Sequence, residues 1–294
     1  EYLAGSLRIT ATFANPNLLS GYLTLLLPIS FSFWLHPKKR YKVFGIITTS
    51  LLGFTLVTTL TRSGYLCVLI GMAGFALIKE RKLLPIILVY ILVFGMMISP
   101  AQTRFTEIKD LGNVSSYSSQ IQDTKAPTTY SSVDSRLRLW SYASQEFAKV
   151  PITGIGIGKF QPNITQFVAA HPASAQFFTY GVEDVHNSYL RLLVETGAFG
   201  LLGLFAILGL WLIPMGKSLW KKRGVYGSLE FGIFFGVIAF LIHNLTNSLL
   251  FRVPTCYAFW ICLAILARFT IIKDNREEIS VHGGNINASK RFTQ

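Results

Sequence analysis

The stretch "NLLSGYLTLLLPISFSFWLHPKKRYK" (17–42) joins a long, mostly apolar run to a cluster of lysine and arginine residues. An apolar run of about 20 residues is long enough to cross the roughly 30 Å hydrocarbon core of a bilayer as a helix. Basic clusters that follow such runs stay predominantly on the cytoplasmic side of the membrane. The stretch therefore predicts a helix that crosses the membrane and ends in the cytoplasm.

The composition of the whole chain agrees with a membrane protein. Of its 294 residues, 51% are hydrophobic and only 14% are charged, whereas soluble domains carry about 25% charged residues. The three cysteines lie in apolar segments without the spacing of a zinc site or a disulfide framework, so we expect no metal. The chain begins with Glu1, and an apolar segment follows almost at once. We therefore expect a fragment of a longer protein, with further helices upstream.

Apolar runs of spanning length recur along the chain. They cover 17–35, 43–60, 64–78, 83–99, 189–213, 229–250 and 254–272. None of them alternates in the manner of an outer-membrane barrel strand. The fold predicted is an all-α integral membrane protein, a bundle of about seven helices in this fragment.

The basic residues predict the orientation of these helices. They concentrate in "HPKKRYK" (36–42), "KERK" (79–82), "GKSLWKKRG" (216–224) and the tail after Lys273, while the alternate connectors carry almost no charge. All four basic segments fit one topology, in which they face the cytoplasm. The net charge of +13 is then mainly an orientation signal, and we expect no nucleic-acid partner.

This topology predicts four regions and one long external loop. They are a first group of four helices (1–99), an extracytoplasmic loop (100–188), a second group of three helices (189–272) and a cytoplasmic tail (273–294). Within the loop, 112–132 is rich in Ser and Thr, which is typical of a flexible segment. The stretch 135–160 predicts an amphipathic helix that ends at Pro151 and leads into a glycine-rich turn.

The glycine-rich turn "GIGIGKF" (154–160) does not fit a nucleotide-binding loop. A P-loop requires G-x-x-x-x-G-K-[ST], but Thr153 stands where the first glycine belongs and Phe160 follows the lysine. Glycines instead permit a tight turn in which two backbones approach closely.

The predicted topology brings several polar residues to the external membrane face. They are Arg8, Asn15, Asn17, Arg62, Arg136, Arg138, His186 and Arg252. Arginine binds phosphate oxygens through a planar, permanently charged guanidinium group. A neutral histidine beside such arginines can accept a proton from a hydroxyl group. The combination favours chemistry on a phosphate-linked lipid carrier.

Each of these residues also has a purely structural interpretation. Arg62 or Arg252 can anchor a helix end at the interface, and Arg136 and Arg138 can be solvated charges on a loop helix. His186 with Asn187 can cap the following helix. Further along, Arg191 and Glu195 are four residues apart, which is typical of an ion pair within one helix.

Four stretches together resemble the O-antigen ligase family, which includes O-antigen and exopolysaccharide polymerases. They are "TFANPNLLSGYLTLLLP" (12–28), "TRSGYL" (61–66), "SRLRLWSYASQEFAKVPITGIGIGKF" (135–160) and "HNSYLRLLVETGAFGLLGL" (186–204). The resemblance implies a GT-C-like membrane glycosyltransferase that is inverting, metal-independent and free of cofactors. It acts in cell-surface polysaccharide biosynthesis at the bacterial cytoplasmic membrane, with its active site on the outer face.

The resemblance also implies substrates and roles for individual residues. The donor is a glycan on undecaprenyl pyrophosphate, and the acceptor is a hydroxyl of a lipid or another glycan. Arg62 and Arg136 would hold the pyrophosphate, and His186 would act on the acceptor hydroxyl. Arg138 and Asn187 are further substrate-binding candidates. The chain reads "TRSG" where many members have Ser-Arg followed by Gly, but the arginine is kept.

Two other classes of function remain open on the sequence alone. A transporter commonly binds its substrate near the bilayer midplane, between inverted repeats, whereas this chain has no visible repeat and its polar residues are predicted at the interface. A non-catalytic envelope-assembly protein would explain the long loop, but it would leave the arginines and the histidine without a role.

Overall fold

The computed structural model describes residues 2–3, 6–7, 9–89, 92, 132–171, 184–221 and 228–269. Within these ranges the protein is helical, apart from a short antiparallel pair of strands, β1 (Tyr2–Leu3) and β2 (Ser6–Leu7). Arg8, the Ser/Thr-rich segment up to residue 131 and the tail after residue 269 lie outside the described residues.

The first helix begins where the sequence supplies a helix cap. Asn15 Oδ1 accepts a hydrogen bond from Leu18 N at 3.0 Å, and Pro16 takes the first helical position, where a missing N–H costs nothing. The elements that follow are α1 (Pro16–Ser32), the 3-10 turn η1 (Phe33–Leu35), α2 (Lys39–Thr58) and α3 (Arg62–Lys79). The first predicted basic segment, 36–42, thus covers the end of the connector between α1 and α2 and the start of α2.

Four of the described helices are long and apolar enough to cross a membrane. They are Pro16–Leu35, Lys39–Thr58, Arg62–Lys79 and Ser188–Trp220, the last of which lies in α8 (Ser188–Lys221). Two shorter apolar helices follow, α9 (Ser228–His243) and the helix Val253–Phe269. Of the predicted crossing 83–99, the described part holds the end of the 3-10 turn η2 (Arg81–Leu83), helical residues 84–89 and Leu92. The protein is a multi-pass helical membrane protein, and the number of seven crossings stays a prediction.

One predicted crossing ends earlier than its apolar composition indicates. The run 229–250 predicts a helix to its end, but α9 stops at His243, and a turn leads to the short 3-10 helix η6 (Leu249–Phe251). The turn contains Asn244, Asn247 and Ser248, all buried. Buried polar groups need hydrogen-bond partners, and these side chains find theirs on other segments of the chain.

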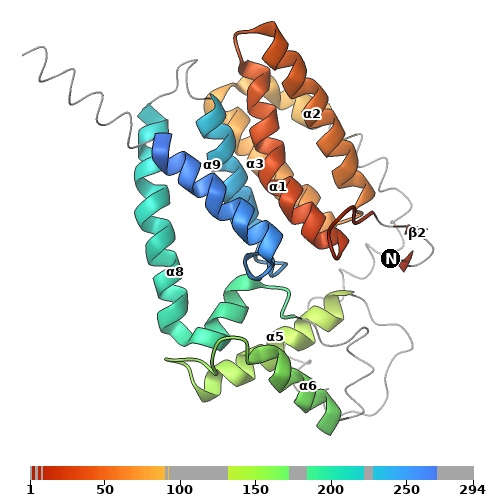
Figure 1. Cartoon of the computed structure of the whole chain (residues 1–294), viewed down its shortest axis with the longest axis vertical. Coiled ribbons are helices and arrows are strands. Elements are labelled where there is room, and N and C mark those ends of the chain that lie inside the picture. The colour runs from red at the N-terminus through yellow and green to blue at the C-terminus, as the bar shows by residue number, and fades with distance from the viewer. Residues whose placement is uncertain are drawn as a thin grey trace, which may run out of the picture.

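The helices form a bundle with a smaller helical unit across one end. α1 packs against α2, α3 and α9, and α3 packs against α9. Below the bundle in Figure 1 lie α5 (Ser132–Lys149) and α6 (Phe160–Ala170). These two helices share a separate apolar core with the beginning of α8, formed by Leu139, Tyr142, Ala143, Phe160, Ile164, Val185 and Val194. We call α5, α6 and this core the end unit.

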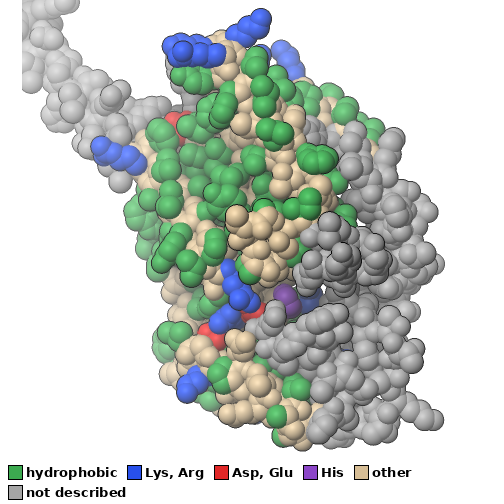
Figure 2. Space-filling view, turned by 45° about the vertical axis from the view of Figure 1, so that its right-hand side comes forward, with side chains coloured by type: hydrophobic (Ala, Val, Ile, Leu, Met, Phe, Trp, Pro, Cys, Tyr) green, Lys and Arg blue, Asp and Glu red, His purple; other side chains and the backbone are tan. Residues whose placement is uncertain are grey.

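Charged residues are distributed unequally between the two ends of the bundle. Figure 2 shows Lys and Arg side chains grouped at the top, far from the end unit. Lys38 of the connector between α1 and α2 and the residues Lys39, Arg40 and Lys42 at the start of α2 are exposed, and so are Arg81 and Lys82 after α3. Two of the predicted cytoplasmic segments, 36–42 and 79–82, therefore lie at one end of the bundle, and the end unit lies at the other.

α8 is bent where the glycine-rich turn contacts it. Gly197 has φ 68° and ψ −169°, which breaks the helix, and in Figure 1 the first part of α8 runs beside α5 before the rest rises along the bundle. A Cβ atom on Gly197 would lie 2.1 Å from Ile152 O, and one on Gly154 would lie 2.5 Å from the carbonyl carbon of Glu195. The expectation of a close backbone approach at the turn is confirmed.

Gly200 and Gly203, the next two glycines of α8 after Gly197, do not lie against another of the described helices. A Cβ atom on Gly200 would meet Thr196 of its own helix, and one on Gly203 would meet no atom within 4 Å. Gly197 instead accommodates the glycine-rich turn.

Candidate functional site

The candidate site lies where the end unit meets the bundle. Several helices begin or end at this junction. α3 begins at Arg62, α8 begins at Ser188, and α9 ends at His243. Ser188 N donates to Asn244 O at 2.9 Å, and Ser188 Oγ donates to Asn244 Oδ1 at 2.5 Å. These bonds fix the start of α8 against the turn after α9.

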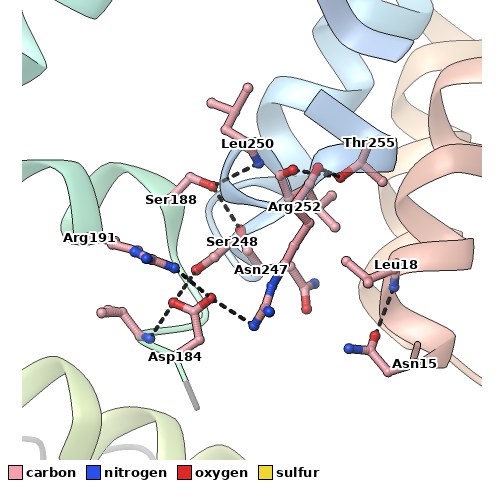
Figure 3. A network of polar contacts seen from close by, with 12 residues as sticks. Asn15, Leu18, Asp184, Ser188, Arg191, Asn247, Ser248, Leu250, Arg252 and Thr255 are labelled. Carbon is pink, nitrogen blue, oxygen red and sulfur yellow. Dashed lines mark hydrogen bonds and ion pairs between the residues drawn. The ribbon is translucent and has the colours of Figure 1, made fainter. Parts of the chain in front are cut away.

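Asp184 joins this junction to the end unit (Figure 3). Its side chain is 2% exposed, and Oδ1 accepts hydrogen bonds from Val185 N at 2.8 Å and Ser248 Oγ at 2.9 Å. Its other oxygen, Oδ2, pairs with Arg191 at 3.2 Å and with Arg252 at 3.3 Å. A buried carboxylate is tolerated only when charge and hydrogen bonds compensate for lost hydration, and Asp184 has both.

Arg191 completes a compact set of opposite charges. Besides Asp184 it pairs with Glu195 at 3.3 Å, one helical turn further along α8. Its guanidinium also lies over the ring of Phe251, 4.3 Å from the ring centroid. The predicted ion pair within the helix is confirmed, and Arg191 has the additional role of binding Asp184.

α5 presents Arg136 to the segment that precedes α8. Trp140 Nε1 donates to Val185 O at 2.8 Å, and Arg136 stands four residues earlier, on the same face of the helix. The charge of Arg136 consequently acts on His186. Two residues that are fifty positions apart in the sequence are thus brought within electrostatic range of each other.

His186 has a left-handed backbone and a neutral side chain. Its φ is 53°, a region that costs a residue with a Cβ atom roughly 1–2 kcal/mol. Neighbouring contacts hold this conformation: Val185 O is bound by Trp140, and Asn187 Oδ1 accepts bonds from Tyr189 N and Leu190 N, both at 3.0 Å. Burial, together with the charge of Arg136, lowers the pKa of His186 to about 4.

A second histidine links three helices behind this site. Thr24 Oγ1 donates to Ser20 O at 2.8 Å, so the same hydroxyl accepts from His243 Nδ1 at 3.1 Å. His243 Nε2 then accepts from Ser63 Oγ at 3.1 Å, and Ser63 accepts from Asn247 Nδ2 at 3.3 Å. This chain of bonds fixes the first turn of α3, in which Arg62 precedes Ser63.

The comparison with known families identifies the type of protein. A family model described as O-antigen ligase matches residues 47–205, more than half of the chain. The chain belongs to the O-antigen ligase family. The matched region contains Arg62, Arg136 and His186, and it confirms the resemblance that the sequence motifs carry. No match was found among curated proteins.

The predicted site residues of this O-antigen ligase family member occupy different environments. Arg136 and His186 lie together, as described above. Arg62 is exposed at the start of α3, at the same end of the bundle, and its side chain makes neither a hydrogen bond nor an ion pair with the described residues. Asn187 caps α8, as its structural interpretation predicts.

Two arginines differ from their structural interpretations. Arg138 is 9% exposed and so is not a solvated charge on the surface of α5. It stands four residues before Tyr142, which belongs to the apolar core of the end unit. Arg252 is more than an anchor at the interface, because it binds the buried carboxylate of Asp184. Its charge also acts on His186.

Sequence reasoning missed two residues that organise the site. Asp184 stands two residues before His186, and a charged residue next to a candidate catalytic residue is a signal that could have found it. His243 lies in "FLIHNLTNS" (240–248), where a histidine and two asparagines interrupt an apolar run. Polar residues within spanning segments tend to be functional or structural centres. Among the described residues, no cluster of His, Cys, Asp and Glu could hold a metal ion.

Proposed function

We propose that this protein transfers a glycan from undecaprenyl pyrophosphate to an acceptor hydroxyl at the outer face of the bacterial cytoplasmic membrane. The observation that carries the proposal is the position of Arg136 beside a neutral, conformationally strained His186 in a member of the O-antigen ligase family. Strained residues cluster at functional sites. Arg62, exposed at the same end of the bundle, supplies a second charge for the pyrophosphate.

The arginines would stabilise the leaving group. As the acceptor oxygen forms its bond to the anomeric carbon, the bond between that carbon and the pyrophosphate oxygen breaks, and negative charge builds on the pyrophosphate. Arg62 and Arg136 would bind that charge, which is the electrostatic contribution that commonly dominates catalysis. Attack opposite the leaving group inverts the anomeric carbon. These two side chains take the place of a metal in a GT-C-like, metal-independent reaction.

His186 would accept the proton of the acceptor hydroxyl. A pKa of about 4 keeps the imidazole neutral at physiological pH, so its free nitrogen can accept a hydrogen bond. The charge of Arg136 is one cause of that low pKa. A bound pyrophosphate would neutralise this charge and raise the pKa of His186 toward the value at which a base works best. The base would therefore strengthen once the donor is in place.

The test is glycan transfer by purified full-length protein in detergent or nanodiscs. Lipid-linked glycan is supplied with candidate acceptors, namely a second lipid-linked glycan or a lipid with a free sugar hydroxyl. We expect Arg62→Ala, Arg136→Ala and His186→Ala each to lower transfer by at least about 100-fold, the scale seen when one group that stabilises a transition state is removed. Elongated lipid-linked chains would indicate a polymerase, and transfer to the other lipid would indicate a ligase.

Two further variants separate chemistry from folding in this experiment. His186→Asn removes the imidazole but suits the left-handed backbone, because asparagine tolerates that region. Arg81→Ala removes an exposed arginine at the opposite end of the bundle and is expected to transfer normally. Normal transfer by His186→Asn, or by all three alanine variants, would refute the proposed roles.

A further inference from the structure

The glycine-rich turn carries an apolar surface that no residue of the proposed reaction requires. Ile152 is 60% exposed and Ile157 is 82% exposed, and Val150 beside them is also exposed. Single exposed apolar residues are common on protein surfaces, but contiguous groups mark sites of interaction. Here three exposed apolar residues occur within eight positions of one short turn, and along the chain exposed lysines, Lys149 and Lys159, flank them.

The turn is hydrogen-bonded to α8 at the bend. Its N–H groups at Ile155 and Gly156 donate to the carbonyl oxygens of Val194 and Glu195, both at 2.9 Å. In return, Ala198 N on the far side of the bend donates to Pro151 O at 2.9 Å. The break at Gly197 removes backbone partners within α8, and the turn replaces them. Backbone hydrogen bonds on both sides of the bend therefore hold the turn against α8.

The position of the bend relative to the membrane follows from the length of the helix beyond it. Residues 198–220 rise about 34 Å at 1.5 Å per residue, close to the roughly 30 Å thickness of the hydrocarbon core. Gly197, and with it the turn, therefore lies near one boundary of that core. Beyond the bend, Phe199 and Leu202 are 71% and 64% exposed, as expected for side chains that face lipid.

We propose that residues 150–158 insert into the phospholipid leaflet beside α8 and anchor the end unit to the membrane. In this arrangement Val150, Ile152 and Ile157 contact the acyl chains beside α8, and Lys149 and Lys159 lie at the headgroup phosphates. Backbone at this depth must have its hydrogen bonds satisfied, and the bonds to α8 do so for part of the turn. The anchor holds α5, and so Arg136, at the depth of the headgroup phosphates.

The inference is tested by measuring the depth of single cysteines in the bilayer. Cys67, Cys256 and Cys262 are replaced by alanine, and the variants Ile157→Cys, Leu210→Cys and Gln145→Cys carry an environment-sensitive fluorophore in nanodiscs that hold one copy of the protein. Leu210 is an exposed residue of the spanning part of α8, and Gln145 is an exposed residue of α5. The label at Leu210 provides the reference for a position deep in the lipid, and the label at Gln145 provides the reference for an aqueous position.

We expect the label at Ile157 to emit at shorter wavelength than the label at Gln145. A nitroxide near the headgroup end of the acyl chain should quench it severalfold more than aqueous iodide does, whereas iodide should dominate at Gln145. Quenching of Ile157 by iodide to the same extent as Gln145, with Leu210 still quenched by lipid, would overturn the inference. Because single-copy nanodiscs exclude a second chain and no glycan is used, this result is independent of the proposed transferase activity.

Discussion

Individual side chains at the junction of the end unit and the bundle determine the state of His186. Burial and the charges of Arg136 and Arg252 lower the pKa of the imidazole, whereas the carboxylate of Asp184 raises it. Removing the charge of Arg136 or Arg252 should therefore raise the pKa of His186. Removing the charge of Asp184 should lower that pKa further. The pH dependence of transfer therefore reports on each neighbour separately.

The first prediction concerns the wild-type pH profile. Below its pKa His186 is protonated and cannot accept a proton, so kcat/KM should fall with an apparent pKa of about 4. The acid limb of kcat should lie at higher pH, because kcat reports on the complex, in which the bound pyrophosphate offsets the charge of Arg136. The same acid limb in kcat and kcat/KM, or a limb of kcat/KM near the ordinary histidine pKa, would contradict the electrostatic coupling.

The second prediction concerns two neighbours of His186 that shift its pKa in opposite directions. Arg252→Gln should move the acid limb of kcat/KM to higher pH, and Asp184→Asn should move it to lower pH. Asp184→Asn should also reduce kcat by about 10- to 100-fold, because the turn that positions His186 loses its two arginine contacts. Glu195→Gln, which removes a different partner of Arg191, should leave the pH of the limb unchanged.

For individual residues, the sequence indicates which ones are functional candidates better than it indicates which residues they contact. Arg62, Arg136 and His186 stand out because charged groups are costly near hydrocarbon, and the intrahelical pair of Arg191 and Glu195 follows from spacing alone. For Asp184 the sequence offers only its position two residues before His186, and its partners do not follow from the sequence. Two of those partners, Ser248 and Arg252, lie more than sixty residues further along the chain.

Among the elements, the bent helix α8 and the glycine-rich turn depend on each other. Gly154 and Gly197 have positive φ, and each lies too close to the opposite backbone for a side chain. The sequence predicts a tight turn from its glycines, but its contact with α8 is a tertiary feature that local spacing does not encode. In the same way, the end of α9 at His243 depends on buried partners elsewhere in the fold.

The third prediction follows from this contact. Gly197→Ala and Gly154→Ala should each destabilise the protein by at least about 1 kcal/mol, since alanine is disfavoured at positive φ and its Cβ has no space. Gly203→Ala, at a position with no atom within 4 Å, should be neutral or slightly stabilising. Thermal unfolding in detergent measures the difference. Equal melting temperatures for Gly197→Ala and Gly203→Ala would contradict it.

For the whole molecule, the separation of the basic end from the end unit is the feature that the sequence predicts most directly. Apolar runs and basic connectors are local patterns with one common physical origin, the hydrocarbon thickness and the cost of moving charge across it. The helices accordingly occur close to where the apolar runs predict them. Which helices pack together does not follow from these patterns, because lipid-facing and protein-facing apolar residues have the same composition.

The fourth prediction tests the orientation in the membrane. In a background without Cys67, Cys256 and Cys262, Lys82→Cys should react with an impermeant maleimide only after the cytoplasmic face is opened. Gln145→Cys should react in intact cells or spheroplasts. Both residues are exposed, so their difference reports on sidedness. The reverse pattern would place the end unit in the cytoplasm and exclude a donor at the outer face.

The bond between Thr24 and His243 has a consequence for biosynthesis. These partners are 219 residues apart in the chain. At about 5–20 residues per second, the ribosome needs roughly 10–45 s to supply the histidine after the threonine. Throughout that interval Thr24 can satisfy its hydroxyl proton on Ser20 O of its own helix. α1 can therefore remain in the bilayer before α9 is synthesised without an unsatisfied hydroxyl proton at Thr24. Packing of α9 against α1 is then one of the last steps of assembly.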